Sequence, residues 1–119
     1  FPKWANNKQN SFYYTSLDEI KPTLKYIDML NGRIKIIAVS DGMLICSDVS
    51  VNGKKLLLTM APNGQPDIYM LNLRSNEYKK LTRYSGIDVN AQFMNNNKIA
   101  FASDRIGYPN IFLKDLSTG

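Results

Sequence analysis

The side chains that could carry out covalent chemistry are few in this 119-residue chain. It has no histidine, so neither a Ser-His-Asp triad nor a histidine metal site can be built from it. Cys46 is the single cysteine and lies in the apolar run MLICSDV, which favours a small buried hydrophobic side chain. Lysines and carboxylates are present, but no spacing places a nucleophile beside a base. We therefore expect no enzyme activity, no catalytic residue, no metal site and no cofactor.

The net charge of +5 would attract an anionic partner, but the basic residues are scattered along the chain. The two lysine doublets, Lys54-Lys55 and Lys79-Lys80, stand beside predicted turns, where solvated charges aid solubility. No apolar run approaches the ~18 residues of a membrane span, so direct membrane insertion is not expected. Six aromatic residues are positioned to stack on bases, yet they match apolar strand positions of an internal repeat, which favours core packing over nucleic-acid binding: Trp4, Tyr13, Tyr14, Tyr69, Phe101 and Phe112.

An internal repeat organises the whole chain. GQPDIYMLNL, at 64–73, recurs as GYPNIFLKDL, at 107–116, which is 43 positions further on. A weaker copy lies 44 positions before the first of these two, so that three copies begin near Trp4, Val49 and Phe93. A fixed period of this length is typical of a repeat architecture, in which each copy is one structural unit.

Each copy contains the same succession of short strands and turns. An Asn-rich turn separates the first two expected strands. A loop that ends in Gly-x-Pro or Lys-Pro precedes the third strand, and a further turn leads to a fourth. The strand DIYMLNL is apolar on both faces, as expected of a sheet stacked between two neighbours. No segment has convincing helical periodicity. Four antiparallel strands in about 43 residues match one blade of a β-propeller.

The sequence therefore predicts an all-β fold, a β-propeller fragment of about three blades. The expected blades are about 4–40, about 44–83 and about 88–119, the third incomplete without its outer strand. The first ten residues, FPKWANNKQN, contain neither an initiating Met nor the apolar core of a signal peptide. We therefore expect this segment to be an internal part of a longer chain. An arc of blades exposes two apolar faces, so we expect the fragment to self-associate, with two copies closing a six-bladed ring.

Two segments carry a family resemblance that spans roughly residues 4–119. VSVNGKKLLLTMAPNGQPDIYMLNLRSNEYKKLT, at 49–82, and KIAFASDRIGYPNIFLKDLSTG, at 98–119, resemble repeats of the TolB propeller family. The closest match is the run of Ser, Asp and Arg at 103–105, with Gly107 and Pro109. The sequence departs from the family at Val51-Asn52, where Pro-Asp is usual, and at 61–63, where Ala-Pro-Asn replaces Ser-Asp-Arg. Related repeats also occur in propellers attached to serine peptidases.

The resemblance implies a periplasmic protein. In it, a six-bladed propeller would follow a separate N-terminal domain. It implies a role in the Tol–Pal cell-envelope system, which serves outer-membrane integrity and cell division. The expected partners are the peptidoglycan-associated lipoprotein Pal, other Tol proteins and some colicin segments. The alternative is an accessory propeller that gates substrate access to a serine peptidase.

Partner binding is expected at the loops that connect strands at one rim of the propeller. SDGML, at 40–44, and RYSGID, at 83–88, join successive blades, and MAPNGQP and SDRIGYP lie on the same rim. Exposed Tyr and Met side chains there would bury contact area at modest entropic cost. The alternative is structural: the loop glycines permit tight connections, and the Asp-Arg pair braces its own loop. The candidate partner-binding residues are Asp41, Gly42, Met43, Tyr84, Ser85, Gly86, Ile87, Asp104 and Arg105.

Overall fold

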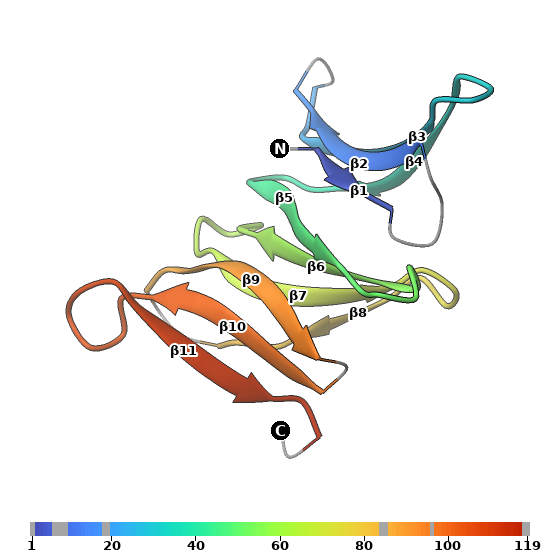
Figure 1. Ribbon diagram of the computed structural model, residues 1–119. Coiled ribbons are helices and arrows are strands. Elements are labelled where there is room, and N and C mark those ends of the chain that lie inside the picture. Colours follow the sequence, from blue (N-terminus) through green and yellow to red (C-terminus); the bar gives the residue numbers. More distant parts are fainter. Residues whose placement is uncertain (1, 6–9, 18–19, 84–85, 96, 118–119) are drawn as a thin grey trace.

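The described residues form three antiparallel sheets that follow one another along the chain (Figure 1). The computed structural model describes residues 2–5, 10–17, 20–83, 86–95 and 97–117, and no helix occurs among them. The sheet orders are β1-β2-β3-β4, β5-β6-β7-β8 and β9-β10-β11, named blades 1, 2 and 3 below. The strands are β1 (Lys3–Trp4), β2 (Ser11–Ser16), β3 (Thr23–Asp28), β4 (Arg33–Val39), β5 (Leu44–Val49), β6 (Lys55–Met60), β7 (Asp67–Asn72), β8 (Glu77–Lys80), β9 (Asp88–Asn95), β10 (Lys98–Ser103) and β11 (Asn110–Asp115).

Asn and Gly residues shape the tight turns within the blades, as the repeat predicts. Gly32 and Gly53 have φ values of 71° and 73°, a left-handed conformation that glycine adopts without steric cost. Ahead of each glycine, an asparagine side chain accepts a hydrogen bond from the backbone two residues on. Asn31 accepts one from the Arg33 amide at 2.8 Å, and Asn52 accepts one from the Lys54 amide at 3.0 Å. These local bonds end one strand and start the next.

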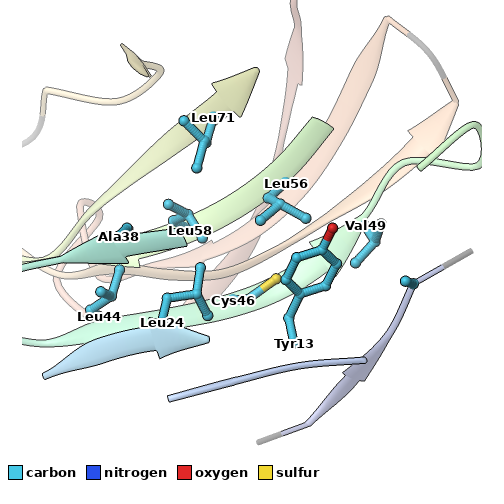
Figure 2. Close-up of a cluster of buried hydrophobic side chains, with 10 residues drawn as sticks. Tyr13, Leu24, Ala38, Leu44, Cys46, Val49, Leu56, Leu58 and Leu71 are labelled. Atoms are coloured by element: carbon cyan, nitrogen blue, oxygen red, sulfur yellow. The ribbon is translucent and has the colours of Figure 1, made fainter. Parts of the chain in front are cut away.

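The core consists of two apolar clusters, one on each side of blade 2. Side chains alternate across a strand, so neighbouring leucines of β6 point to opposite faces. Leu56 and Leu58 belong to the cluster shared with blade 1, which Figure 2 shows together with Tyr13. Leu57 belongs to the cluster shared with blade 3, which also contains Phe101. The prediction that both faces of the repeated strands are covered is confirmed for blade 2.

Polar side chains of blade 2 also bind the backbone of blade 3. A β-bulge between Cys46 and Asp48 interrupts the pairing of β5 with β6. Beside this bulge, the Ser47 hydroxyl donates to the Ala91 carbonyl at 2.6 Å, and the Asp48 carboxylate accepts from the Phe93 amide at 2.7 Å. These bonds fix the position of β9 along blade 2.

The outermost faces of the arc are apolar and exposed. On blade 1, Trp4 is 63% exposed and packs edge-on against Phe12, with ring centroids 5.7 Å apart. The expectation that Trp4 packs in the core is therefore wrong, because Trp4 and Phe12 lie on the face of blade 1 that turns away from blade 2. On blade 3, Ile111 and Leu113 are each 66% exposed. The described chain thus presents two uncovered sheet faces.

The two-sided burial of blade 2 predicts a large cost for truncating Leu57. Its side chain is fully buried, so Leu57→Ala is expected to lower the free energy of unfolding by about 3 kcal/mol through lost burial and a residual cavity. Val51→Ala is the control, because Val51 is 82% exposed, and it should change stability by less than about 0.5 kcal/mol. Urea titration followed by circular dichroism measures both values. Equal losses for the two variants would contradict the two-cluster core.

Candidate partner-binding rim

Five connections gather at one end of the strands and form the rim. Because successive strands run in opposite directions, the β2–β3, β4–β5, β6–β7, β8–β9 and β10–β11 connections share this end, on the left of Figure 1. The β3–β4, β5–β6 and β7–β8 turns lie at the opposite end, called the turn end below. The described residues of the candidate loops 40–44 and 83–88 therefore lie on the rim.

The β4–β5 loop is fixed against the β6–β7 loop by a backbone bond and a close approach. The Ala61 amide donates to the Met43 carbonyl at 3.0 Å. A Cβ atom at Gly42 would overlap the carbonyl oxygen of Ala61, so no larger residue fits there without movement. Gly42 thus has a structural role, and Met43 is left 45% exposed at the rim surface.

Asp41 forms an ion pair that joins two rim connections. Its carboxylate lies 2.6 Å from the Lys21 ammonium, which belongs to the β2–β3 connection, and both side chains are exposed. The hydrogen bond from Lys21 lowers the pKa of Asp41, and the same bond raises the pKa of Lys21. Water screens such an exposed pair, so it orients the two side chains and adds little stability.

Asp104 holds the end of the β8–β9 connection. The Ile87 amide donates to the Asp104 carboxylate at 3.0 Å, and the Asp104 amide donates to the Ile87 carbonyl at 3.3 Å. This pair of bonds positions the Ile87 side chain, which is 49% exposed. Gly86 is half-buried beside it. The candidates Tyr84 and Ser85 lie outside the described residues.

Arg105 is directed into the space between blades 2 and 3. Its guanidinium contacts both carboxylate oxygens of Asp88, at 3.2 and 3.1 Å, and Asp88 is fully buried. The guanidinium also lies 5.2 Å from the ring centroid of Phe101 and 5.1 Å from that of Phe112. These contacts support the structural alternative for Arg105. Asp88 is not among the candidate residues predicted from the sequence, where its signal is an acidic residue at the first position of β9.

The rim carries more exposed apolar side chains than the two predicted from the sequence, Met43 and Ile87. Exposed apolar neighbours lie on the other connections as well. Apolar side chains gathered at one end of a protein mark an interaction surface more often than single scattered ones. The further exposed apolar residues of the rim connections are Leu17, Ile20, Ile106 and Tyr108.

Other kinds of site are not supported by the described residues. No group of three or more His, Cys, Asp or Glu side chains among them is placed to hold a metal ion. Burial raises the pKa of Cys46 to about 12, so its thiol is protonated at neutral pH. Among the residues that the structure describes, no helix is long and apolar enough to cross a membrane.

A series of antiparallel sheets stacked face to face, with the connecting loops gathered on one rim, defines a β-propeller. Comparison with protein families agrees, because the model of the TolB beta propeller domain matches residues 1–119. The chain belongs to the TolB β-propeller domain family. This confirms both the predicted propeller fragment and the resemblance that its repeats carry.

Individual relatives give the same family. The Tol-Pal system protein TolB of Wolinella succinogenes is 50% identical over 117 residues, which is 98% of this chain and 28% of that protein. The crystal structure of TolB from Acinetobacter baumannii has a TM-score of 0.89 and 31% identity, over 99% of this chain and 30% of that one. The chain thus spans less than a third of these relatives. The isopeptidase AtxE2 matches with a TM-score of 0.70 at 8% identity, over 99% of this chain and 27% of its own, which shows a shared fold alone.

The buried carboxylate of Asp88 is expected to matter more for stability than the exposed carboxylate of Asp41 on the rim. Asp88→Ala is expected to lower the free energy of unfolding by about 2 kcal/mol, because Arg105 loses its charged partner. Asp41→Ala should leave the urea midpoint unchanged, since water replaces its exposed partner. Urea titration of both variants is the measurement. A destabilised Asp41 variant beside an unaffected Asp88 variant would refute this assignment.

Proposed function

We propose that the chain is a non-enzymatic protein–protein interaction module of the periplasm whose rim docks the lipoprotein Pal. The observation that carries the proposal is the placement of Met43 and Ile87 at the rim surface, each beside a backbone bond that joins two loops. Relatives named Tol-Pal system protein TolB support Pal as the partner. Other Tol proteins and colicin segments are further partners for the same loops.

The rim suits protein docking because its exposed apolar side chains are held before a partner arrives. A side chain on a braced loop loses less conformational freedom on binding, so more of the contact energy remains as affinity. Met43 and Ile87 are about half exposed, which leaves contact area for a partner to cover. The Lys21–Asp41 pair adds polar groups beside this apolar area.

The peptidase alternative is less well supported. The likeness to an isopeptidase is one of fold, at 8% identity. A gating propeller would belong to a polypeptide that also carries a Gly-x-Ser-x-Gly nucleophile segment, and that sequence feature decides between the two readings.

Reversing the polarity of the two rim side chains should abolish Pal binding. The double variant Met43→Asp with Ile87→Asp is expected to weaken binding at least about tenfold, because it places charges where apolar contact area is buried. Met29→Asp with Val51→Asp is the matched control. It changes the net charge equally at exposed apolar residues of the turn end.

Binding is measured with purified Pal by pulldown and calorimetry at low and moderate salt, with the full-length Wolinella succinogenes TolB as comparison. Absence of Pal binding by both proteins would refute the proposed function. Binding by the full-length relative alone would refute the assignment to these two loops.

We also infer that the 119-residue chain self-associates through its two uncovered faces. Trp4, Ile34 and Ile36 on blade 1, and Ile111 and Leu113 on blade 3, are each more than half exposed. In the two interfaces between neighbouring blades, the face of one blade is covered by the opposite face of the next. The uncovered face of blade 3 in one copy can pack in the same way on the uncovered face of blade 1 in another copy. Two copies would then close one ring.

Sedimentation tests the association. The chain is expected to sediment as a dimer, and Ile111→Lys with Leu113→Lys should shift it toward monomer because two charges enter the apolar face. A wild-type chain that remains a well-folded monomer at high concentration would contradict the inference.

A further inference from the structure

A second surface lies at the turn end, in a groove between blades 1 and 2. The groove has a volume of about 580 Å³, which is within the usual range of ligand sites. Both flanking blades have all four strands, so two complete sheets form its walls. One wall belongs to β2, β3 and β4, and the other to the β5–β6 turn, the β7–β8 turn and β8. Its lining includes Tyr13, Tyr26, Lys35, Lys54, Arg74 and Tyr78.

Three cations surround the groove without a carboxylate among its lining residues. Lys35 lies on β4, Lys54 in the β5–β6 turn and Arg74 in the β7–β8 turn, and all three residues are exposed. None of them forms an ion pair with another residue of the described ranges. Uncompensated charges of one sign around a concave surface raise the local concentration of anionic groups.

Hydrogen bonds hold the two turns that carry Lys54 and Arg74. The Leu73 amide donates to the Lys54 carbonyl at 3.0 Å, which links one turn to the other. Within its own turn, the Arg74 amide donates to the Asn72 side chain at 2.9 Å. The two cations therefore start from fixed backbone positions, which lowers the entropy lost when they bind a ligand.

Tyrosine side chains form the apolar part of the groove. The rings of Tyr13 and Tyr26 lie 5.1 Å apart between centroids, and Tyr78 is 46% exposed. Burial raises the pKa of Tyr13 to about 12, so its hydroxyl is neutral at physiological pH and does not offset the lysines. Tyrosine combines a large apolar surface with a polar group and is common where proteins bind peptides.

We propose that this groove binds an extended acidic segment of a protein partner, at a site separate from the rim. Carboxylates of the segment pair with Lys35, Lys54 and Arg74, and an apolar side chain between them covers the tyrosines. The cations stand on three separate elements, which suits several spaced carboxylates better than one phosphate, whose ligands converge on a single point. Since the groove is at the turn end, a segment bound there leaves the rim loops free for another partner.

A labelled peptide tests the site in the wild-type chain. The probe is a fluorescein-labelled octapeptide in which glutamate alternates with leucine, and its binding is followed by fluorescence anisotropy at low and moderate salt. The comparison peptide has glutamine in place of each glutamate. The acidic peptide should bind, the binding should weaken as salt rises, and the glutamine peptide should bind at least about tenfold more weakly.

Two double variants locate the binding. Lys54→Glu with Arg74→Glu is expected to reduce affinity for the acidic peptide about tenfold or more, because two attractive contacts become repulsive. Lys79→Glu with Lys98→Glu changes the net charge equally at exposed lysines that do not line the groove, and it should retain affinity within about twofold. Circular dichroism confirms that both variants are folded.

Four outcomes would overturn the proposal. The first is equal loss of affinity in both double variants, which would indicate attraction to net charge alone. The second is equal binding of the glutamine peptide. The third is the absence of any peptide binding at low salt. The fourth is displacement of the peptide by millimolar inorganic phosphate or by phosphatidylglycerol vesicles, which would assign the groove to a phosphate or a lipid headgroup. None of these outcomes bears on Pal binding at the rim.

Discussion

Each sheet of this protein is apolar on both faces, and the rest of the structure depends on that constraint. Three successive leucines in β6 divide between two clusters, with Leu57 facing blade 3 and its two neighbours facing blade 1. Such a sheet is not stable alone in water, because covering one face leaves the other exposed. Stacking covers these apolar faces, because each added blade buries the exposed face of its neighbour. Its own second face then remains exposed until another blade is added. The uncovered faces at both ends of the described arc follow directly from this rule.

Stacking also separates the scaffold from the surfaces that are available for binding. Neighbouring blades cover the faces of the strands. The loops and turns at the two ends of the strands therefore remain accessible to partners. At the rim, bonds between neighbouring loops hold Met43 and Ile87 at the surface. At the turn end, a bond between two turns sets the backbone beside Lys54 and Arg74. The rim therefore presents exposed apolar side chains on braced loops, and the turn end presents a basic groove with tyrosines beside exposed apolar residues of its own.

The sequence predicts the repeating parts of the molecule well and the contacts between repeats poorly. Period-two apolar patterns and Asn-rich turns are local signals, so the strands and the two-sided burial of blade 2 could be predicted. The direction of the Arg105 side chain depends on Asp88, 17 positions earlier, and on two rings of the same blade. The exposure of Trp4 depends on which face of β1 meets blade 2. The groove unites Tyr13 with Lys54 and Arg74 from different blades, and no local pattern signals such a meeting.

The polar bonds between blades 2 and 3 bear on how freely these repeats can diverge. Ser47, Asp48 and Thr59 supply the side chains, but each binds a main-chain atom of β9: the carbonyl of Ala91 and the amides of Phe93 and Asn90. Every amino acid except proline offers both of these backbone groups, whatever its side chain. The receiving strand can therefore accumulate substitutions over evolutionary time without losing its docking bonds. Copies that have become dissimilar in sequence, as the first and third are here, still fit the same stacked arrangement of sheets.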